Sequence, residues 1–322
     1  MTNKIVQPDR PELALKPKRW MAWVVLFLGL GLTLLGWRTS VDSSERQARA
    51  RFDARTDELH AAVQSRLIAY AQVLRGSRAY VGVTGNPGRA QWASLYEALS
   101  VTDNYPGITG IVYIRATTDS EREALLARLR KEEPNFAIRP PGDRPYYMLV
   151  TAVEPRTTSN LPVIGSDSWS NPERRRVLED ARDSGENRIT GKLNLVIDDP
   201  NKPTPAFLMY QAVYRDGEIP AGVEERRSKL LGFVAGGFRI DALMLGILGK
   251  LPRDVALRVY DSESIDETRL FHASHPDHSA SLAGFQRQHS LKVGGRTWAV
   301  QYASLPAFDA EALVVRSINN IT

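Results

Sequence analysis

The chain of 322 residues contains no cysteine. This absence excludes disulfide bonds, thiolate metal sites and a cysteine nucleophile, and it suits an extracytoplasmic compartment without proving one. The sequence also lacks G-x-x-x-x-G-K-[ST], G-x-G-x-x-G and G-x-S-x-G. These patterns form phosphate-binding loops, dinucleotide-binding turns and the nucleophile elbows of hydrolases. We therefore expect no cofactor and find no motif for catalysis.

The chain also has no large excess of positive or negative charge. The chain has 42 Lys and Arg against 37 Asp and Glu, a net charge of +5, and its densest basic run is the three arginines at 174–176. Nucleic-acid binding usually needs a basic patch or stripe. We interpret the run as the solvated face of a helix and expect no nucleic-acid partner. The hydrophobic share of 43% is ordinary for a folded chain.

One long hydrophobic run is present, at residues 20–37, and Thr33 is its only polar residue. At roughly 1.5 Å per residue, eighteen helical residues span about 27 Å, close to the ~30 Å hydrocarbon core of a bilayer. Trp20, Trp23 and Trp37 mark its ends, where indole rings favour the headgroup region. The pattern predicts a transmembrane helix.

The flanks of this run predict its orientation. Five basic residues precede it and only Arg38 follows immediately, so the positive-inside rule places residues 1–19 in the cytoplasm as an arm. The rest of the chain would then lie on the outer side of the inner membrane, in the periplasm. A cleaved signal peptide is disfavoured because no small-residue cleavage site follows Trp37 directly. A buried core helix fits the length, but the basic flank and aromatic ends favour a membrane span.

Residues 41–84 predict a long stalk helix that could continue the membrane helix outward. Apolar residues recur at steps of three, four or seven, which places them on one helical stripe. This stripe fits a core contact, a seam between two copies of the chain, or both; its members are Phe52, Leu59, Val63, Leu67, Tyr70 and Leu74.

The remaining chain mixes short helical and strand patterns separated by Gly, Pro and Asn turns. This order indicates an α+β fold with two small sheets rich in antiparallel hairpins. Asn171 before Pro172 and Ser170 before Glu173 are alternative N-caps of one helix. The expected helices are 90–101, 119–132, 172–184 and 240–248, and the expected strands are 108–114, 136–138, 146–154, 189–197, 206–214, 229–238, 255–260, 269–273, 286–293 and 297–302.

Several motifs, in their order and spacing, resemble the CHASE sensor family over roughly residues 53–248. They are Tyr105-Pro-Gly-Ile108 before ITGIVYI, Gly165-Ser-Asp-Ser-Trp-Ser170 before a helix that stops at Gly185, Gln211-Ala-Val-Tyr214, and LGFVAGGFR at 231–239. The resemblance implies a stalk helix followed by two PAS-like modules, a membrane-distal one at 85–228 and a membrane-proximal one at 229–305. It also implies a small-molecule ligand in the distal module and a homodimer along the stalk.

The resemblance places two ligand contacts. Asp167, within Ser166-Asp-Ser-Trp-Ser170, corresponds to the aspartate with which plant cytokinin receptors read an adenine edge, and Ile189 corresponds to a ligand-contacting leucine. A carboxylate in an apolar pocket can accept hydrogen bonds from a ring N–H. Trp169 and the proline-rich turn at 198–205 differ from those receptors, so cytokinin itself is not inferred. Asp167 equally fits a helix cap, because short polar residues before helices commonly bind backbone N–H groups.

A histidine-rich segment is the remaining candidate site. His272, His275 and His278 have His-x-x-His-x-x-His spacing. Imidazoles bind Zn²⁺ or Cu²⁺ well, but Pro276 interrupts the segment and no distant ligand is evident. We therefore expect no metal site.

These patterns together predict a non-catalytic, ligand-sensing region of a membrane receptor, whose output domain, such as a histidine kinase or diguanylate cyclase, is absent from this chain. Two alternatives stay open, a membrane-tethered dimerising adaptor and a membrane-anchored periplasmic hydrolase. In residues 306–322 an apolar run at 312–315 is stopped by Arg316. We interpret this tail as a truncation before a second membrane helix, or as the end of a member that does not cross back.

Overall fold

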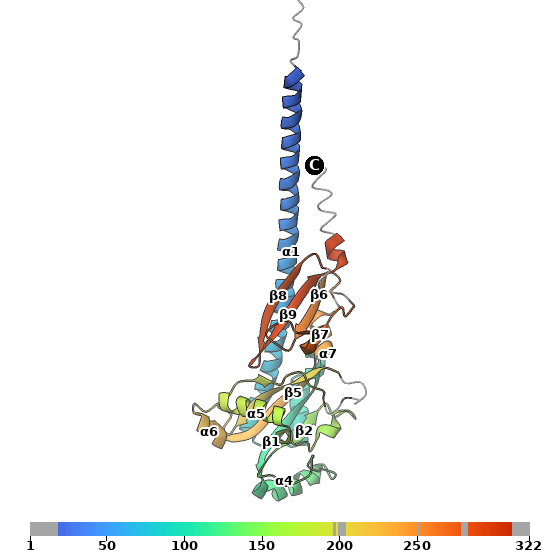
Figure 1. Cartoon of the computed structure of the whole chain (residues 1–322). Coiled ribbons are helices and arrows are strands. Elements are labelled where there is room, and N and C mark those ends of the chain that lie inside the picture. The colour runs from blue at the N-terminus through green and yellow to red at the C-terminus, as the bar shows by residue number, and fades with distance from the viewer. Residues whose placement is uncertain (1–18, 196–197, 199–203, 250–251, 278–282, 311–322) are drawn as a thin grey trace, which may run out of the picture. The chain divides into compact units, whose positions relative to one another are not determined.

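The computed structural model describes residues 19–195, 198, 204–249, 252–277 and 283–310 (Figure 1). The chain divides into two units, which we treat separately. The first unit comprises Met1–Arg51 and Ala310–Thr322, and the second comprises Phe52–Asp309.

Helix α1 (Arg19–Thr84) contains 66 residues, and its residues up to Arg51 belong to the first unit. The hydrophobic run at 20–37 is helical as expected, and it is continuous with the helix expected at 41–84. Large apolar side chains are exposed along it, among them Val25 at 70% and Phe27 at 66%. No helix within the described residues is both long enough and apolar enough to cross a bilayer. The prediction of a membrane helix at 20–37 is thus not supported.

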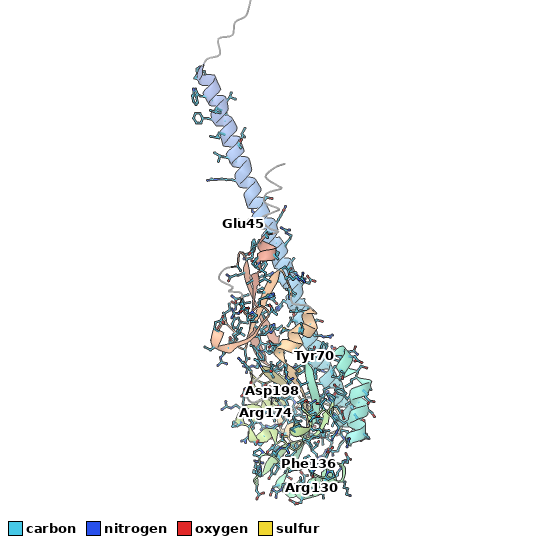
Figure 2. All side chains as sticks on the ribbon, turned by 90° about the vertical axis from the view of Figure 1, so that its right-hand side faces the viewer. Glu45, Tyr70, Arg130, Phe136, Arg174 and Asp198 are labelled. Carbon is cyan, nitrogen blue, oxygen red and sulfur yellow. The ribbon has the colours of Figure 1, made fainter. Side chains whose placement is uncertain are left out.

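In the second unit, α1 is a core helix. The six residues of the predicted apolar stripe are all buried there, with at most 6% of their surface exposed. Tyr70 lies where α1 meets a sheet (Figure 2), and its ring centroid is 5.3 Å from that of Phe238. A stripe of this kind forms because residues three and four apart share one helical face. The core interpretation of the stripe is confirmed.

A five-stranded antiparallel sheet forms the first half of this unit, in the order β2-β1-β5-β4-β3. Its strands are β1 (Ile108–Thr118), β2 (Tyr146–Glu154), β3 (Arg188–Ile189), β4 (Ala206–Tyr214) and β5 (Leu230–Arg239). Helices α2 (Arg89–Ala98) and α3 (Val101–Asn104) precede β1 in the chain, and α4 (Asp119–Glu132), α5 (Pro172–Ser184) and α6 (Val223–Ser228) lie between the strands. The central strand β5 follows the expected module boundary at 228/229 yet pairs with β1 and β4.

The two faces of this sheet have different partners. Successive side chains of a strand point to opposite faces, so Val234 and Phe238 of β5 join α1 in one apolar cluster, while Phe233 and Ala235 join Leu178 of α5 in another. The sheet is therefore the middle layer between α1 and α5.

A second antiparallel sheet has the order β7-β6-β9-β8. It consists of β6 (Val255–Tyr260), β7 (Leu270–Ala273), β8 (Gln286–Val293) and β9 (Arg296–Ser304), and α7 (Ile240–Leu248) precedes it. Gly294 and Gly295 turn the β8–β9 hairpin with φ of 50° and 79°, as two-residue hairpin turns require. Phe207 of β4 touches Trp298 of β9, with ring centroids 5.3 Å apart. The α+β prediction with a long helix and two antiparallel sheets is confirmed.

Three expected elements differ from the structure. Residues 136–138 form no strand; Arg139 instead makes an isolated bridge with Ser166. The expected strand at 189–197 is reduced to the two residues of β3 and an isolated bridge at Leu193, and 196–197 lie outside the described residues. The helix expected at 90–101 divides into α2 and α3 because Ser100 has a left-handed φ of 47°.

Candidate ligand-binding site

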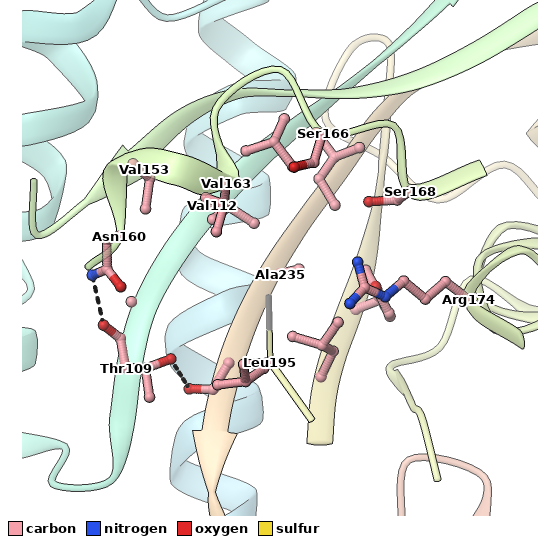
Figure 3. Close-up of a pocket in the computed structure, with 16 residues that line it drawn as sticks. Thr109, Val112, Val153, Asn160, Val163, Ser166, Ser168, Arg174, Leu195 and Ala235 are labelled. Carbon is pink, nitrogen blue, oxygen red and sulfur yellow. Dashed lines mark hydrogen bonds between the residues drawn. The ribbon is translucent and has the colours of Figure 1, made fainter. Parts of the chain in front are cut away.

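A hollow lies on the α5 face of the five-stranded sheet (Figure 3), with an empty volume of about 600 Å³ that includes its open mouth. The floor is formed by alternate residues of β1, β5 and β4 that share this face. Two floor positions of β5 carry little or no side chain, Ala235 and Gly237, so they leave the space above them empty. The other floor residues are Gly110, Val112, Ile114, Leu208 and Tyr210.

The wall of the hollow comes from the segment between β2 and α5. It contains two short 3₁₀ turns, η1 (Leu161–Val163) and η2 (Ser168–Ser170). Asn160 is buried, and its Nδ2 donates to the carbonyls of Thr109 at 2.8 Å and Pro155 at 2.9 Å. Because both partners are acceptors, the NH₂ end of this amide is fixed and its Oδ1 is an available acceptor beside the hollow.

Arg174 enters the hollow from the first turn of α5 (Figure 3). The helix begins there because Asn171 is its N-cap: Asn171 Oδ1 accepts a hydrogen bond from the backbone N of Arg174 at 3.0 Å. Of the two caps considered from the sequence, Asn171 is thus the one used. Ser170 instead donates its hydroxyl to the carbonyl of Asp167 at 2.6 Å.

The three arginines at 174–176 do not share one environment. Arg174 is half-buried in the hollow, and Arg175 lies over the Trp169 ring, 5.5 Å from its centroid, while its Nε donates to the Trp169 carbonyl. Only Arg176 is exposed. The interpretation of this run as a solvated face is therefore wrong. Three consecutive helical residues cover about 200° of the circumference, so they cannot all lie on one solvated face. This geometry is the sequence signal that one of the three arginines faces inward.

Hydroxyl groups lie beside Arg174. Ser166, Ser168 and Tyr210 line the hollow, and Tyr210 lies near Ser168. Burial raises the pKa of Tyr210 to about 12, opposed by the positive charge of Arg174. The phenol is therefore protonated at neutral pH. The described lining of the hollow thus presents one cation and several neutral polar groups on a mostly apolar surface.

Asp167 is buried next to this site but does not line the hollow. Its Oδ1 accepts hydrogen bonds from the backbone N of Met148 at 2.9 Å and of Trp169 at 3.0 Å, and its Oδ2 pairs with Arg144 Nη1 at 3.2 Å. The first of these bonds ties the segment to β2, and the second caps η2. The capping interpretation of Asp167 is therefore confirmed, whereas its contact with a ligand stays a prediction.

The environment of Asp167 has opposing effects on its charge. Burial raises the pKa of this carboxyl, while the two backbone N–H donors and the charges of Arg144 and Arg175 lower it, with burial the largest effect. The flanking Ser166 and Ser168 both line the hollow. Asp167 thus holds the segment that carries these two serines.

Ile189 is buried in the core and does not line the hollow. Its backbone N donates to the carbonyl of Gly294 at 3.0 Å, at the turn between β8 and β9. The two residues that the resemblance implied as ligand contacts are therefore not brought together on the wall of this hollow.

The histidine segment forms pairs rather than a cluster. His272 Nδ1 lies 2.6 Å from Asp241 Oδ1, and His275 Nδ1 lies 2.9 Å from Ser274 Oγ. His278 lies outside the described residues. Within the ranges that the structure describes, no three His, Cys, Asp or Glu side chains are arranged to hold a metal ion.

Comparison with known proteins identifies the family. The sequence model of the CHASE domain matches residues 85–272, which is more than half of the chain. The chain belongs to the CHASE domain family. This match confirms the resemblance seen in the sequence. CHASE domains are sensory domains of receptors. The match begins directly after α1 ends at Thr84 and extends into β7.

A curated relative is a signalling protein. "Hybrid signal transduction histidine kinase A" of Dictyostelium discoideum is 25% identical over 232 residues, which cover 62% of this chain and 11% of the relative. The chain therefore spans about a ninth of the length of that protein. Among solved structures, the ligand-binding domain of the Pseudomonas aeruginosa PAO1 amino acid chemoreceptor PctC, in complex with GABA, has a TM-score of 0.46 and 14% identity, covering 80% of this chain and 99% of that one.

Proposed function

We propose that this CHASE domain binds a small molecule in the hollow above the five-stranded sheet and serves as the ligand-sensing region of a receptor. The observation that carries the proposal is the hollow itself. Its apolar floor and few converging polar groups are the composition typical of small-molecule sites. In this proposal the region works outside the cytoplasm and has no catalysis of its own.

Strand β5 is a physical route from the hollow to α1. Ala235 and Gly237 face the hollow, whereas Gly236 between them lies on the opposite face, where a Cβ would stand 3.5 Å from Leu74 Cδ2 of α1. A ligand that moves β5 therefore changes the packing of α1. It shifts the balance between two arrangements only by its difference in affinity for them. We propose that α1 relays this shift to an output domain, as a stalk that pairs with a second copy.

Asp167 has an indirect role in this proposal. Its three hydrogen-bonding partners are all protein groups, so it holds Ser166 and Ser168 in place rather than facing the hollow. Direct contact between Asp167 and a ligand would require Arg144 or the backbone donors to be displaced first.

The test is a thermal-shift screen of the full chain against small organic molecules. A ligand at about 100 times its Kd adds ~2.7 kcal/mol to the free energy of unfolding and so raises the melting temperature. Ala235→Leu fills the hollow and should abolish the shift. Ala212→Leu is the matched control, because Ala212 is equally buried in the α5-face cluster but does not line the hollow.

The alternatives predict other outcomes. A hit that persists in Ala235→Leu would place the ligand elsewhere, and turnover of a hit would favour the hydrolase. A complete lack of saturable ligands would favour the adaptor.

A further inference from the structure

We propose that the ligand is an organic monocarboxylate with an apolar body, and that Arg174 binds its carboxylate. The inference rests on the proposed function, because it concerns the ligand of the same hollow. It begins from the charges on the wall. Of the residues that the structure describes, sixteen line the hollow (Figure 3), and Arg174 is the only charged one among these sixteen.

Arg174 has no acidic partner among the described residues. Its own backbone N is used by the Asn171 cap, but its guanidinium makes no ion pair with any of the carboxylates that the structure describes. The side chain of the preceding residue, Glu173, lies beside Gly191: a Cβ atom added to Gly191 would stand 3.3 Å from Glu173 Oε1. The buried Asp167 is engaged by Arg144. A half-buried guanidinium without a counter-ion favours an anion that enters from solvent.

The groups beside Arg174 suit a carboxylate as well. Ser166 and Ser168 carry hydroxyls that can donate, and Tyr210 is a protonated phenol next to Ser168. A planar guanidinium with nearby hydroxyls matches the two oxygens of a carboxylate. Among the residues that the structure describes, no carboxylate side chain lines the hollow to repel the ligand.

The rest of the hollow defines the body of the ligand. Asn160 and Arg174 lie on opposite sides of it (Figure 3), and the surface between them is apolar. Asn160 Oδ1 accepts one hydrogen bond from a hydroxyl or an amide of the ligand. The apolar side chains that line the hollow include Val112, Val150, Val163 and Leu195.

The same inventory argues against cationic and zwitterionic ligands. An ammonium group placed in this hollow would find no carboxylate among the lining residues and would lose its hydration. A base edge read by a carboxylate would need Asp167 to turn inward, away from Met148 N, Trp169 N and Arg144. A carboxylate with an uncharged tail places no ammonium group in the hollow and does not require Asp167 to leave its partners.

The experiment compares carboxylates with neutral and cationic molecules of the same shape, using the full chain, thermal shift and calorimetry. The probes are hexanoate and phenylacetate, their amides hexanamide and phenylacetamide, and the amines hexylamine and phenethylamine. Wild type should bind the carboxylates more tightly than the amides and should not bind the amines. Arg174→Gln should weaken carboxylate binding by about 10- to 100-fold, the worth of a hydrogen bond to a charged group, and should erase the preference over amides.

Arg176→Gln is the matched control, because Arg176 is exposed on the same helix; its carboxylate affinity should equal that of wild type. The unliganded melting temperature of Arg174→Gln should be unchanged or higher, since an unpaired charge is removed, and this readout separates loss of binding from loss of fold. The inference is overturned if neither carboxylate binds, or if carboxylates and amides bind equally and Arg174→Gln changes nothing. Binding of an amine, or binding of an amide as tight as that of its carboxylate, that Ala235→Leu abolishes would overturn only this inference, whereas binding of every probe unaffected by Ala235→Leu would overturn the proposed function.

Discussion

At the scale of single residues, the Ser166-Asp167-Ser168 triplet shows that neighbouring residues facing opposite sides of a segment have different roles. The two serines line the hollow, and the aspartate between them faces Met148 N, Trp169 N and Arg144 instead. The sequence identifies an acidic residue at this position, but it cannot tell on which side of an irregular segment the carboxylate lies. That depends on the pairing of this segment with β2, which is a long-range contact.

Asp167→Ala should destabilise the chain by about 3 kcal/mol, because it leaves two buried N–H donors and the Arg144 guanidinium without their shared acceptor. Urea unfolding measures this change. Asp167→Asn is the matched variant: it keeps an acceptor for the backbone donors and should lose less stability. A loss of stability below about 1 kcal/mol in Asp167→Ala would contradict the inference that Asp167 holds this segment in place.

At the scale of elements, the parts of the fold that sequence predicts well are those set by local signals. The helix expected at 119–132 is α4, with identical limits, and the strands expected at 146–154 and 206–214 are β2 and β4. Capping residues and periodicity lie within these segments, so no distant contact is needed to recognise them.

Elements that depend on pairing are less predictable. Strand β5 has a clear strand pattern, yet nothing local reveals that it lies between β1 and β4 rather than in the later sheet. Residues 136–138 have strand-like composition but find no partner strand. The hollow follows from such pairing too, since β1, β4 and β5 build its floor. Arg174 was thus visible as a residue but not as part of a site.

The N-terminus of α5 sets the position of Arg174 and allows an element-scale prediction. Asn171→Ala removes the acceptor for the backbone N of Arg174 and should cost about 1 kcal/mol of stability. Because the first turn then frays, the affinity for a carboxylate bound at Arg174 should fall as well. Ser170→Ala is the control, since Ser170 does not cap α5, and it should affect the helix less. Equal losses in the two variants, measured by thermal unfolding, would contradict this assignment of the cap.

Helix α1 meets strand β8 through a pair of stacked imidazoles. The ring centroids of His60 and His289 lie 4.7 Å apart, and the Tyr302 hydroxyl lies 3.3 Å from His60 Nδ1. Burial and then repulsion by the partner ring lower the pKa of His60 from its ordinary 6.5, and burial and then Arg287 lower that of His289. Asp57 opposes both shifts, with its Oδ1 3.6 Å from His289 Nε2.

These shifts predict how stability changes with pH. A histidine whose folded-state pKa is lowered binds fewer protons when folded than when unfolded, so the free energy of unfolding should decrease as pH falls through the ordinary value of 6.5. In the double variant His60→Phe/His289→Phe, which preserves a ring stack, this decrease should become shallower below pH 6.5. His275→Asn is the control, because His275 belongs to neither α1 nor β8. An unchanged slope in the double variant would show that the pair does not titrate as described.

At the scale of the second unit as a whole, the two sheets share one core. Phe207 of β4 stacks on Phe238 of β5 with ring centroids 4.9 Å apart, and it also meets Phe271 of β7 and Trp298 of β9 at 6.1 Å and 5.3 Å. All four rings are buried in the same apolar cluster as the α1 stripe. The sheets should therefore unfold together rather than as independent modules.

Phe207→Ala tests this cooperativity. Removing a fully buried ring should cost about 3–5 kcal/mol. Because the ring touches both sheets, amide exchange should accelerate to a similar degree in β1 of the first sheet and in β6 of the second. Leu161→Ala is the control, since Leu161 is 39% exposed on η1 and should change both rates little. Faster exchange in β1 alone would mean that the sheets open separately, and movement of β5 would then not be transmitted to the second sheet. Faster exchange in both sheets would mean that movement of β5 is transmitted to α1 and to the second sheet through one continuous core.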